Sequence, residues 1–445
     1  MSLPPSARGV AENGMEGAGE HRAARDLLMA IAPRLRGQSL QVEGEAMLKA
    51  ATRVALALDE SVLPVQGPPG AGKTFTGARM ICALVRAGKR VGITANSHKV
   101  VRNLLDEVVR AAGEEHLPIR CVQKVDDKHQ EKDLDSLHFV KNNEQALDAM
   151  RAGCAVGGGT SYFWARPDAR LCVDVLFIDE AAQMALANVV AVSQAAKSVV
   201  LLGDPRQLEQ PIQGSHPDGV GVSALDHVLG HHATIPADRG LFLDETWRLH
   251  PLICAFNSEL FYEGRLKSRP GLERQQVKSN TRFKGSGLRY LPVQHDGNQS
   301  SSPEEADAIG ELASEIVGSR TSWVDRNGDE SPITLDDVLI IAPYNAQVFE
   351  LQERIPGARV GTVDKFQGQE APIVIYSMST SSHADAPRGM EFLYSANRLN
   401  VAISRAKCIC VVVASRRLFE AECRTPRQMQ LANAFCRYLE LASDL

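Results

Sequence analysis

Short apolar runs alternate with longer amphipathic segments along most of this 445-residue chain. A short apolar run bounded by Gly, Pro or polar residues predicts a buried strand, whereas apolar residues at every third or fourth position predict a helix. Because parallel strands are joined by long crossovers that usually contain a helix, this alternation predicts an α/β fold with parallel sheets. Strands are expected over residues 62–65, 89–95, 171–178, 199–202, 241–243, 338–342, 359–362, 372–379 and 409–413.

The strand–helix pattern runs twice, which predicts two tandem domains over residues 21–240 and 241–445. The strand at 241–243 is expected to open the second domain. Residues 113–152 are polar and charged with weak periodicity, and are expected to form a small insertion in the first domain. This insertion either contacts a nucleic-acid strand or is a solvated face. Residues 1–20 are rich in Gly, Ala, Glu and Pro and are expected to be disordered.

Several helix starts carry capping residues. Ser97 is expected to cap the helix that contains Val100 and Leu104. Ser302, Pro303 and Glu305 predict an N-cap, a proline at the first helical position and a reciprocal capping glutamate. Further helices are expected over residues 21–35, 43–58 and 397–407.

The run Gly67–Thr74 reads Gly-Pro-Pro-Gly-Ala-Gly-Lys-Thr and lies between a predicted strand and a predicted helix. This spacing is typical of a phosphate-binding loop, because glycines let backbone N–H groups turn inward and the helix directs its positive end to the same place. Lys73 is expected to neutralise the β- and γ-phosphates of ATP, and the Thr74 hydroxyl to hold Mg²⁺. Nucleotide contacts are expected from Gly67, Pro68, Pro69, Gly70, Ala71, Gly72, Lys73, Thr74 and Phe75.

Two other apolar strands end in residues suited to phosphate chemistry. Asp179 and Glu180 follow the strand at 171–178. Asp179 is expected to hold Mg²⁺, and Glu180 to accept a proton from an attacking water. Gln207 follows the strand at 199–202 and can sense the γ-phosphate, because an amide donates and accepts without titrating. In a parallel sheet such residues gather at the carboxyl ends of the strands.

Other strand ends carry candidates for contact with a nucleic-acid strand. The hydroxyl groups of Thr94 and Ser97 suit phosphate contact, and Ser97 can cap a helix at the same time. The glycine-rich stretch ending in Thr160 is followed by Phe163 and Trp164. These two rings either stack on bases or pack in the core.

Composition narrows the choice of partners. The formal net charge is −5, so any nucleic-acid contact must come from a local groove. The nine cysteines are scattered without a C-x-x-C pair, which favours reduced thiols in a cytoplasmic protein. No apolar run is long enough to cross a bilayer, so no membrane partner is expected.

The second half repeats the strand–helix pattern but lacks a phosphate loop. It offers arginines instead: Arg248 lies in a short stiff stretch, and Arg405 lies near the end of a predicted helix. Alone, each arginine would be a surface ion-pair former. If the two halves face each other, both can reach the γ-phosphate of ATP, stabilise transition-state charge and couple hydrolysis to domain closure.

These motifs together resemble those of the superfamily 1 helicases. The matching segments are, in chain order, 67–74, 179–183, 203–208, 246–251, 363–370 and 400–407. The sequences Asp-Glu-Ala-Ala, Trp-Arg-Leu-His-Pro and Val-Asp-Lys-Phe-Gln-Gly-Gln-Glu resemble the 5′-to-3′ branch, which includes the nonsense-mediated-decay helicase. The chain resembles most the helicase half of bacterial fusions that carry a RecB-type nuclease. The resemblance covers residues 22–440.

The resemblance implies two tandem RecA-like domains and a role for each matching residue. Lys73, Asp179, Glu180, Gln207, Arg248 and Arg405 would be catalytic, with Thr74 and Asp179 holding the metal. Trp247 would stack on adenine, and Glu370 would contact ribose. The nucleic-acid backbone would be contacted by Thr94, Ser97, Thr160, Tyr344, Thr362 and Gln367.

The sequence therefore predicts an ATP-dependent helicase or translocase that moves 5′-to-3′ on single-stranded DNA, with RNA as the alternative substrate. A monomer is expected, with a nuclease as partner. The chain departs from the family in lacking a clear adenine-reading glutamine and the β-barrel insertion of the decay helicase, and no nuclease activity is expected of it. The alternative function is a nucleotide-dependent binding switch that recruits a nuclease without unwinding.

Overall fold

The structure is a computed structural model that describes residues 14, 21–127, 134–209, 221–318 and 320–445. It divides into two compact units. The first consists mainly of residues 72–205 and 209–243 together with the chain before Pro68, and the second of residues 244–445, with 68–71 and 206–208 grouped with it. The disorder predicted for residues 1–20 falls, Gly14 apart, on residues outside those that the structure describes.

The first unit is built on an eight-stranded sheet with the order β4-β3-β5-β2-β6-β7-β1-β8, and every pairing in it is parallel. The strands are β1 (Val62–Gln66), β2 (Val91–Thr94), β3 (Cys121–Lys124), β4 (Leu137–Val140), β5 (Val156–Gly158), β6 (Val173–Ile178), β7 (Ala196–Gly203) and β8 (Leu241–Phe242). The helices are α2 (Arg22–Leu28), α3 (Met47–Ala57), α4 (Lys73–Arg86), α5 (His98–Glu114), α6 (Asn143–Arg151), α7 (Ser161–Trp164), α8 (Leu186–Ser193) and α9 (Ala224–Leu229).

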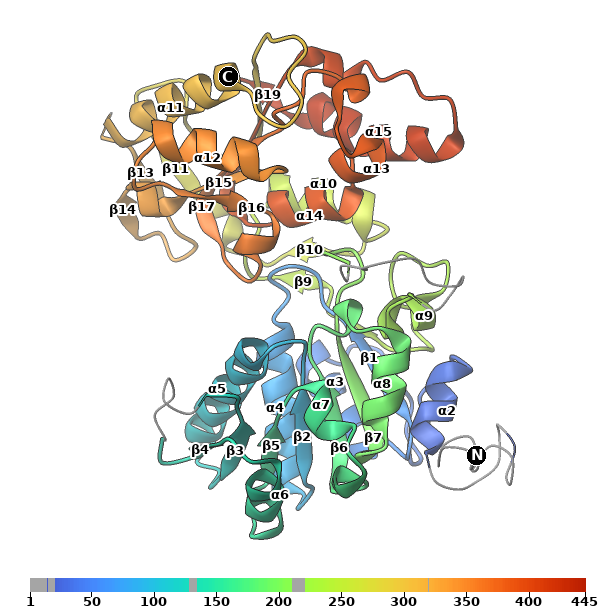
Figure 1. Cartoon of the computed structure of the whole chain (residues 1–445). Coiled ribbons are helices and arrows are strands. Elements are labelled where there is room, and N and C mark those ends of the chain that lie inside the picture. Colours follow the sequence, from blue (N-terminus) through green and yellow to red (C-terminus); the bar gives the residue numbers. More distant parts are fainter. Residues whose placement is uncertain (1–13, 15–20, 128–133, 210–220, 319) are drawn as a thin grey trace. The chain divides into compact units, whose positions relative to one another are not determined.

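Helices cover both faces of this sheet (Figure 1). The chain moves in one direction along the sheet through α4 and α5, and in the other direction through α7 and α8. Because crossovers between parallel strands are right-handed, the two pairs of helices lie on opposite faces. Strands such as β1, covered on both faces, are buried throughout, which explains their continuous apolar sequence.

The second unit has a six-stranded parallel sheet with the order β16-β15-β17-β18-β12-β19. A three-stranded antiparallel sheet, β11-β13-β14, and a short parallel pair, β9-β10, accompany it (Figure 1). Its core is a continuous apolar cluster that includes Ile309 and Leu312 of α11, Ile340 of β15 and Val411 of β18.

The strands of the second unit are β9 (Glu245–Thr246), β10 (Lys267–Ser268), β11 (Gln276–Lys278), β12 (Gly287–Pro292), β13 (Ser322–Val324), β14 (Glu330–Pro332), β15 (Val338–Ala342), β16 (Arg359–Thr362), β17 (Ala371–Ser377), β18 (Ala406–Ala414) and β19 (Ser443–Asp444). The helices are α10 (Pro251–Phe261), α11 (Pro303–Gly318), α12 (Asn345–Arg354), α13 (Gly389–Leu393), α14 (Ala396–Ile403) and α15 (Pro426–Leu441).

Three details of the predicted organisation are wrong. The strand at 241–243 does not open the second unit: β8 pairs with β1 and completes the first sheet. The described residues of the predicted insertion at 113–152 add strands β3 and β4 to the edge of that sheet, followed by helix α6. The helix expected over 397–407 ends at Ile403, because Ala406 already pairs with Ala371 of β17.

Candidate functional site

The phosphate-loop sequence has the backbone conformation that its glycines predict. Gly70 and Gly72 have φ angles of 72° and 78°, a region that side chains disfavour. A Cβ atom at Gly67 would lie 2.2 Å from Cγ of Lys73, so only glycine fits beneath that side chain. The loop joins the carboxyl end of β1 to the first residue of α4, Lys73.

The start of α4 is open to an anion. Its N-cap residue, Gly72, has no side chain to accept hydrogen bonds from the first turn of the helix. Those N–H groups and the positive end of the helix dipole are suited to phosphate oxygens. The ammonium group of Lys73 donates to the carbonyl oxygen of Gly67 at 2.9 Å, which places its charge over the same loop. Thr74 is partly buried, and the exposed ring of Phe75 lies 3.2 Å from the guanidinium carbon of Arg79.

Asp179 and Glu180 follow β6, which is separated from β1 by β7 alone. Asp179 is buried, and its Oδ1 accepts a hydrogen bond from the backbone N–H of Glu180 at 2.9 Å. Burial, and to a lesser extent the charge of Glu180, raise the pKa of Asp179 to about 7, although the charge of Lys73 acts to lower it. The sheet thus brings Lys73 within electrostatic reach of a buried carboxylate.

The residues present fit a magnesium ion that binds with a nucleotide. Such an ion takes one or two protein oxygen ligands and completes its shell with phosphates and water. Thr74 and Asp179 offer a hydroxyl and a carboxylate from the phosphate loop and from β6. In the part of the chain that the structure describes, no group of three or more His, Cys, Asp or Glu side chains forms a metal cage of its own.

Glu180 has a positive φ of 52°, which is rare for a residue with a side chain. Strained backbone of this kind persists where the surroundings hold it, often at functional sites. Here the strain lies directly after the buried carboxylate and orients the partly exposed Glu180. Gln207 is buried after β7 and belongs with the residues grouped with the second unit.

In the second unit, three residues from two other segments, Glu370, Ser404 and Lys407, lie around Arg248. Its Nε donates to the carboxylate of Glu370, and its Nη1 donates to the carbonyl oxygen of Ser404 at 3.2 Å. The other Glu370 oxygen lies 2.9 Å from Nζ of Lys407. Burial would raise the pKa of Glu370, but the charges of Arg248 and Lys407 and their hydrogen bonds lower it overall. Glu370 therefore bridges two cations as a carboxylate.

Arg405 is buried beside the same cluster. Its Nη1 donates to the carbonyl oxygen of Gln369 at 3.2 Å, and its own carbonyl oxygen accepts from the N–H of Ala371 at 3.0 Å. The two predicted arginine sensors thus contact neighbouring residues of one segment, 369–371. The ring of Trp247 is 43 % exposed, and the guanidinium carbon of Arg269 lies 3.5 Å from its centroid.

The predicted nucleic-acid residues of the first unit differ in accessibility. Thr94 ends β2 and is fully buried, so its side chain does not present a hydroxyl group on the surface of this unit. Ser97 is exposed and caps α5 by accepting from the N–H of Val100, as predicted. Thr160 is partly exposed at the start of α7. Of these three, Ser97 and Thr160 can reach a ligand in this conformation.

The predicted nucleic-acid residues of the second unit lie near the ends of its strands. Tyr344 occupies the N-cap position of α12 without a capping hydrogen bond from its side chain, is largely buried, and packs its ring 5.4 Å from that of Phe392. Thr362 ends β16, and Gln367 follows the short turn at Asp364–Phe366. Both Thr362 and Gln367 are partly exposed.

Sequence reasoning missed Tyr162. Phe163 and Trp164, whose role was left open, are both core residues: their rings meet edge to face, and Trp164 donates to the carbonyl oxygens of Ile93 and Gly159. Between them and Thr160, the side chain of Tyr162 is 89 % exposed. The pair of buried rings fixes α7 to the sheet and leaves Tyr162 in solvent. A tyrosine next to two apolar aromatics gave no signal in the sequence pattern.

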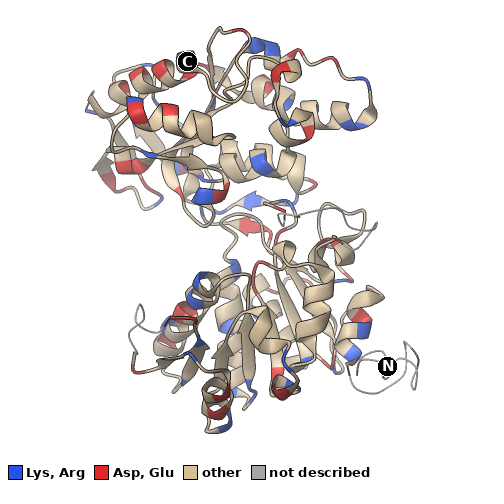
Figure 2. Ribbon diagram, viewed as in Figure 1, with Lys and Arg blue, Asp and Glu red and all other residues tan. Residues whose placement is uncertain are grey.

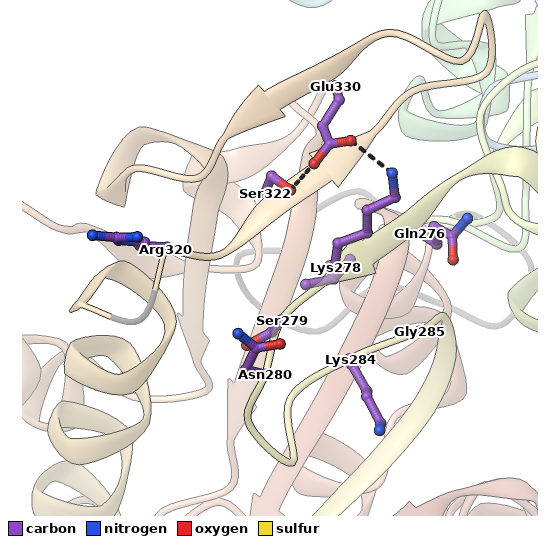
Figure 3. A pocket seen from close by; sticks show the side chains of 10 residues that line it. Gln276, Lys278, Ser279, Asn280, Lys284, Gly285, Arg320, Ser322 and Glu330 are labelled. Atoms are coloured by element: carbon purple, nitrogen blue, oxygen red, sulfur yellow. Dashed lines mark hydrogen bonds and ion pairs between the residues drawn. The ribbon is translucent and has the colours of Figure 1, made fainter.

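The distribution of charged side chains does not indicate a nucleic-acid-binding surface. Lys and Arg residues are interspersed with Asp and Glu residues over both units (Figure 2). An open polar pocket of about 670 Å³ lies between β11, the following loop and β13 in the second unit. In Figure 3, Lys278 points to Glu330, whereas Arg320 and Lys284 point elsewhere. The cations therefore do not converge on one ligand, and none of the predicted site residues lines this pocket.

The fold and the loop define a class of protein first: a P-loop nucleotide-binding protein with two RecA-like α/β domains. Family models described as AAA domain match the chain twice, over residues 47–220 and 221–417. The chain also resembles curated proteins. It is 26 % identical over 416 residues to the DNA replication ATP-dependent helicase/nuclease JHS1 of Arabidopsis thaliana, covering 87 % of this chain and 29 % of that protein.

Two further similarities were found. The chain is 25 % identical over 420 residues to the regulator of nonsense transcripts 1 homolog of Drosophila melanogaster, covering 81 % of this chain and 33 % of that protein. A solved complex of Arterivirus nonstructural protein 10 (helicase) with DNA aligns at 14 % identity and a TM-score of 0.45, covering 86 % of this chain and 64 % of that one.

The predicted family is therefore confirmed: this chain carries the ATP-dependent helicase domains of superfamily 1. It spans about a third of the length of the two curated relatives described above. Among the residues that the structure describes, no helix is both long and apolar enough to cross a membrane.

Proposed function

We propose that this protein hydrolyses ATP to move 5′-to-3′ along single-stranded nucleic acid, with DNA as the preferred substrate, and thereby separates duplexes. The observation that carries the proposal is the gathering of the phosphate loop, Lys73 and the Asp179–Glu180 pair at the carboxyl edge of the first sheet. The names of the relatives support helicase activity and the choice of DNA.

The proposed chemistry assigns one task to each residue. The N–H groups at the start of α4 and the Lys73 ammonium bind the β- and γ-phosphates of ATP. Magnesium, when bound through Thr74 and Asp179, would neutralise developing phosphate charge. Glu180 accepts a proton from the attacking water, which makes that water a better nucleophile. Gln207 orients the same water or senses the γ-phosphate through its amide.

Arg248 and Arg405 of the second unit are proposed to stabilise negative charge on the transferred phosphoryl group. Their support is the cluster described above, in which the Glu370 carboxylate and the carbonyl oxygens of Ser404 and Gln369 hold both guanidinium groups. Trp247 is proposed to stack on adenine, since its ring is exposed. Glu370 is proposed to contact ribose, which requires it to exchange part of its present pairing with Arg248 and Lys407.

For the nucleic-acid strand, we propose contacts with Ser97, Thr160, Thr362 and Gln367, which are at least partly exposed. Thr94 and Tyr344 are buried in this structure and would contact a strand only after a local rearrangement. Tyr162 is added as a base-stacking residue, because its ring is exposed on a helix that two buried aromatic residues anchor to the sheet.

We also propose that the protein is a cytoplasmic monomer. All nine cysteines are free thiols, and burial raises the pKa of several, among them Cys82 to about 11 and Cys254 to about 12, which keeps them protonated and unreactive. A nuclease partner is proposed on the name of one relative, a helicase/nuclease. Light scattering of the purified protein, with and without a DNA oligonucleotide, tests the monomer.

The experiment that tests the proposed function measures ATP hydrolysis with no strand, with single-stranded DNA and with single-stranded RNA. The same protein is then given duplexes with a 5′ or a 3′ tail. We expect hydrolysis to rise with DNA and unwinding to occur on 5′-tailed duplexes. An ATPase that is indifferent to both strands, with no unwinding, would instead support a nucleotide-dependent switch that recruits a nuclease.

A further inference from the structure

Gln275 lies outside every helicase motif, yet it contacts the segments that carry both predicted arginine sensors. It precedes β11 and is buried, with 3 % of its surface exposed. Its side-chain nitrogen donates to the carbonyl oxygen of Arg248 at 2.9 Å and to that of Lys407 at 3.2 Å. An amide has two N–H groups, so each carbonyl can take one of them.

Other hydrogen bonds and ion pairs join the same two segments, the one around Arg248 and the one around Lys407. The backbone N–H of His250 donates to the carbonyl oxygen of Lys407 at 3.1 Å. Arg248 donates to the carbonyl oxygen of Ser404, and Glu370 pairs with both Arg248 and Lys407. The stretch around Arg248 is therefore joined to the stretch that follows α14 by backbone, amide and ionic contacts together.

The backbone of Gln275 is itself held by two hydrogen bonds. The hydroxyl group of Ser286 donates to the backbone carbonyl oxygen of Gln275 at 2.6 Å, and the N–H of Gln275 donates to the carbonyl oxygen of Leu272. These two bonds fix the backbone of Gln275, and burial leaves its side chain few alternative rotamers. Its two N–H groups consequently set the separation between the backbone at position 248 and the backbone at position 407.

A buried glutamine often does no more than satisfy two backbone carbonyls. Here, the two carbonyls belong to Arg248 itself and to the residue two positions after Arg405. The contact between the Arg248 guanidinium group and Glu370 fixes that side chain only in part, because the proposed function requires Glu370 to contact ribose as well. When Glu370 changes partner, the backbone bond from Gln275 still holds Arg248.

We propose that Gln275 is a positioning residue for ATP hydrolysis: it holds the arginine sensors Arg248 and Arg405 in a fixed relation, so that both act on the γ-phosphate together. The proposal rests on the proposed function, since it presumes that Arg248 takes part in hydrolysis. Displacement of a catalytic group by about 1 Å can reduce the rate about 100-fold, so a loss of this support has a measurable effect.

The test replaces Gln275 with methionine, which has nearly the same shape and no hydrogen-bond donor. The full chain is assayed for ATPase kcat with saturating single-stranded DNA, and for affinity toward a fluorescent ATP analogue. We expect kcat to fall about tenfold, within that estimate, while analogue affinity changes less than about twofold. The matched control is Gln276→Met, an exposed neighbour that lines the pocket in Figure 3 and should leave both values unchanged.

A double-mutant cycle separates positioning from general destabilisation. Adding Gln275→Met to Arg248→Ala should reduce kcat by a smaller factor than in the wild type, because one of the two residues to be positioned is already gone. Ser286→Ala provides a milder second variant if Gln275→Met fails to fold. It should lower kcat about two- to threefold in the wild type, and by a smaller factor in the Arg248→Ala background.

The two proposals fail in different ways. If Arg248→Ala loses activity but Gln275→Met and Ser286→Ala keep the wild-type kcat, or if their effects multiply with that of Arg248→Ala, the positioning role is overturned and the proposed function stands. If Arg248→Ala itself hydrolyses ATP at the wild-type rate, the proposed role of Arg248 is overturned as well.

Discussion

Asp179 of the first unit and Glu305 of the second are both buried carboxylates beside the carboxyl end of a strand, but their surroundings differ. Glu305 is fully buried and surrounded by donors: Oε2 accepts from the Ser377 hydroxyl at 2.6 Å and from the Ser379 N–H at 2.9 Å. Its Oε1 lies 3.0 Å from Nε2 of His295, whose other ring nitrogen contacts Ser381 at 2.8 Å. Asp179 accepts one bond from a neighbouring backbone N–H and lies near Lys73.

The difference in hydrogen-bond partners distinguishes a carboxylate that stabilises the fold from one that is suited to bind a ligand. A buried carboxylate with three hydrogen-bond partners holds a fold together, because removing any partner leaves a buried group without its bond. A buried carboxylate with few partners is costly, and its raised pKa reports that cost. Such a group is retained where a ligand completes its surroundings. We therefore infer a structural role for Glu305, and the surroundings of Asp179 support the proposal that it binds a metal.

The largest expected effect is that of Lys73→Ala. The variant loses the ammonium group that neutralises phosphate charge, so strand-stimulated ATP hydrolysis should fall at least about 1,000-fold, to the limit of detection. A steady-state ATPase assay measures it. The matched control is Lys89→Ala, an exposed lysine just beyond α4, which should keep wild-type activity. Persistent strand-stimulated hydrolysis in the Lys73 variant would rule out this nucleotide site.

The second prediction concerns Glu305. Glu305→Gln keeps the size of the side chain but replaces one accepting oxygen with a donor that faces existing donors. We expect the free energy of unfolding to drop by about 2–3 kcal/mol, the range for a buried hydrogen bond to a charged group. Urea unfolding followed by circular dichroism gives the value. An unchanged midpoint would contradict the structural role, and Glu304→Gln at the exposed neighbouring position serves as control.

The third prediction compares neighbouring aromatic residues of α7. Tyr162→Ala should weaken binding of single-stranded DNA about tenfold, since one base stack contributes about 1–3 kcal/mol. Because Tyr162 is exposed, the same change should alter the free energy of unfolding by less than about 0.5 kcal/mol. Trp164→Ala should instead destabilise the fold by about 3–5 kcal/mol. Fluorescence anisotropy with a labelled oligonucleotide measures binding, and wild-type affinity in the Tyr162 variant would remove this residue from the interface.

The smallest expected effect depends on pH. The pKa of Asp179 in the folded protein is raised to about 7 from 3.8, so the folded state binds the proton more tightly than the unfolded state. The wild-type protein is then favoured at low pH and loses stability as pH rises toward 7. Without nucleotide, Asp179→Asn should be more stable than the wild type at pH 8 by at least about 1 kcal/mol, the value of one pKa unit.

This gain should shrink at pH 4.5, where the wild-type carboxyl group in the folded protein is protonated. Urea unfolding at the two pH values tests it, with Asp148→Asn at an exposed position as control. An Asp179→Asn variant that is less stable than the wild type at pH 8 would show that this carboxylate contributes to stability rather than lowering it.

The sequence predicted most reliably those features that depend on local patterns. Continuous apolar runs indicated the central strands, such as β6 and β15, because strands buried on both faces have few polar residues. The phosphate loop was predicted for a similar reason, since its glycines and lysine are consecutive. The two-residue strand β8 was assigned to the wrong unit, because its pairing with β1 is a long-range contact.

The features that sequence reasoning missed depend on contacts between distant segments. Glu305 was interpreted as a capping-box residue three positions after Ser302. Ser302 does cap the helix by accepting from the Glu305 N–H, but the Glu305 carboxylate bonds to Ser377 and Ser379, more than 70 residues away. Gln275 has an unremarkable sequence context, and its partners lie at positions 248 and 407. Neither position carries a local signal of its role.

The proposed function requires that Arg248 and Arg405 act on the phosphate that the phosphate loop binds. Single-turnover hydrolysis of ATP by Arg405→Ala, with saturating single-stranded DNA, tests it most directly. The chemical step should slow about 1,000-fold, the lower end of the range for such an arginine, while affinity for ATP stays within about threefold of the wild-type value. A wild-type rate of hydrolysis in this variant, with the protein folded and ATP bound, would contradict the claim.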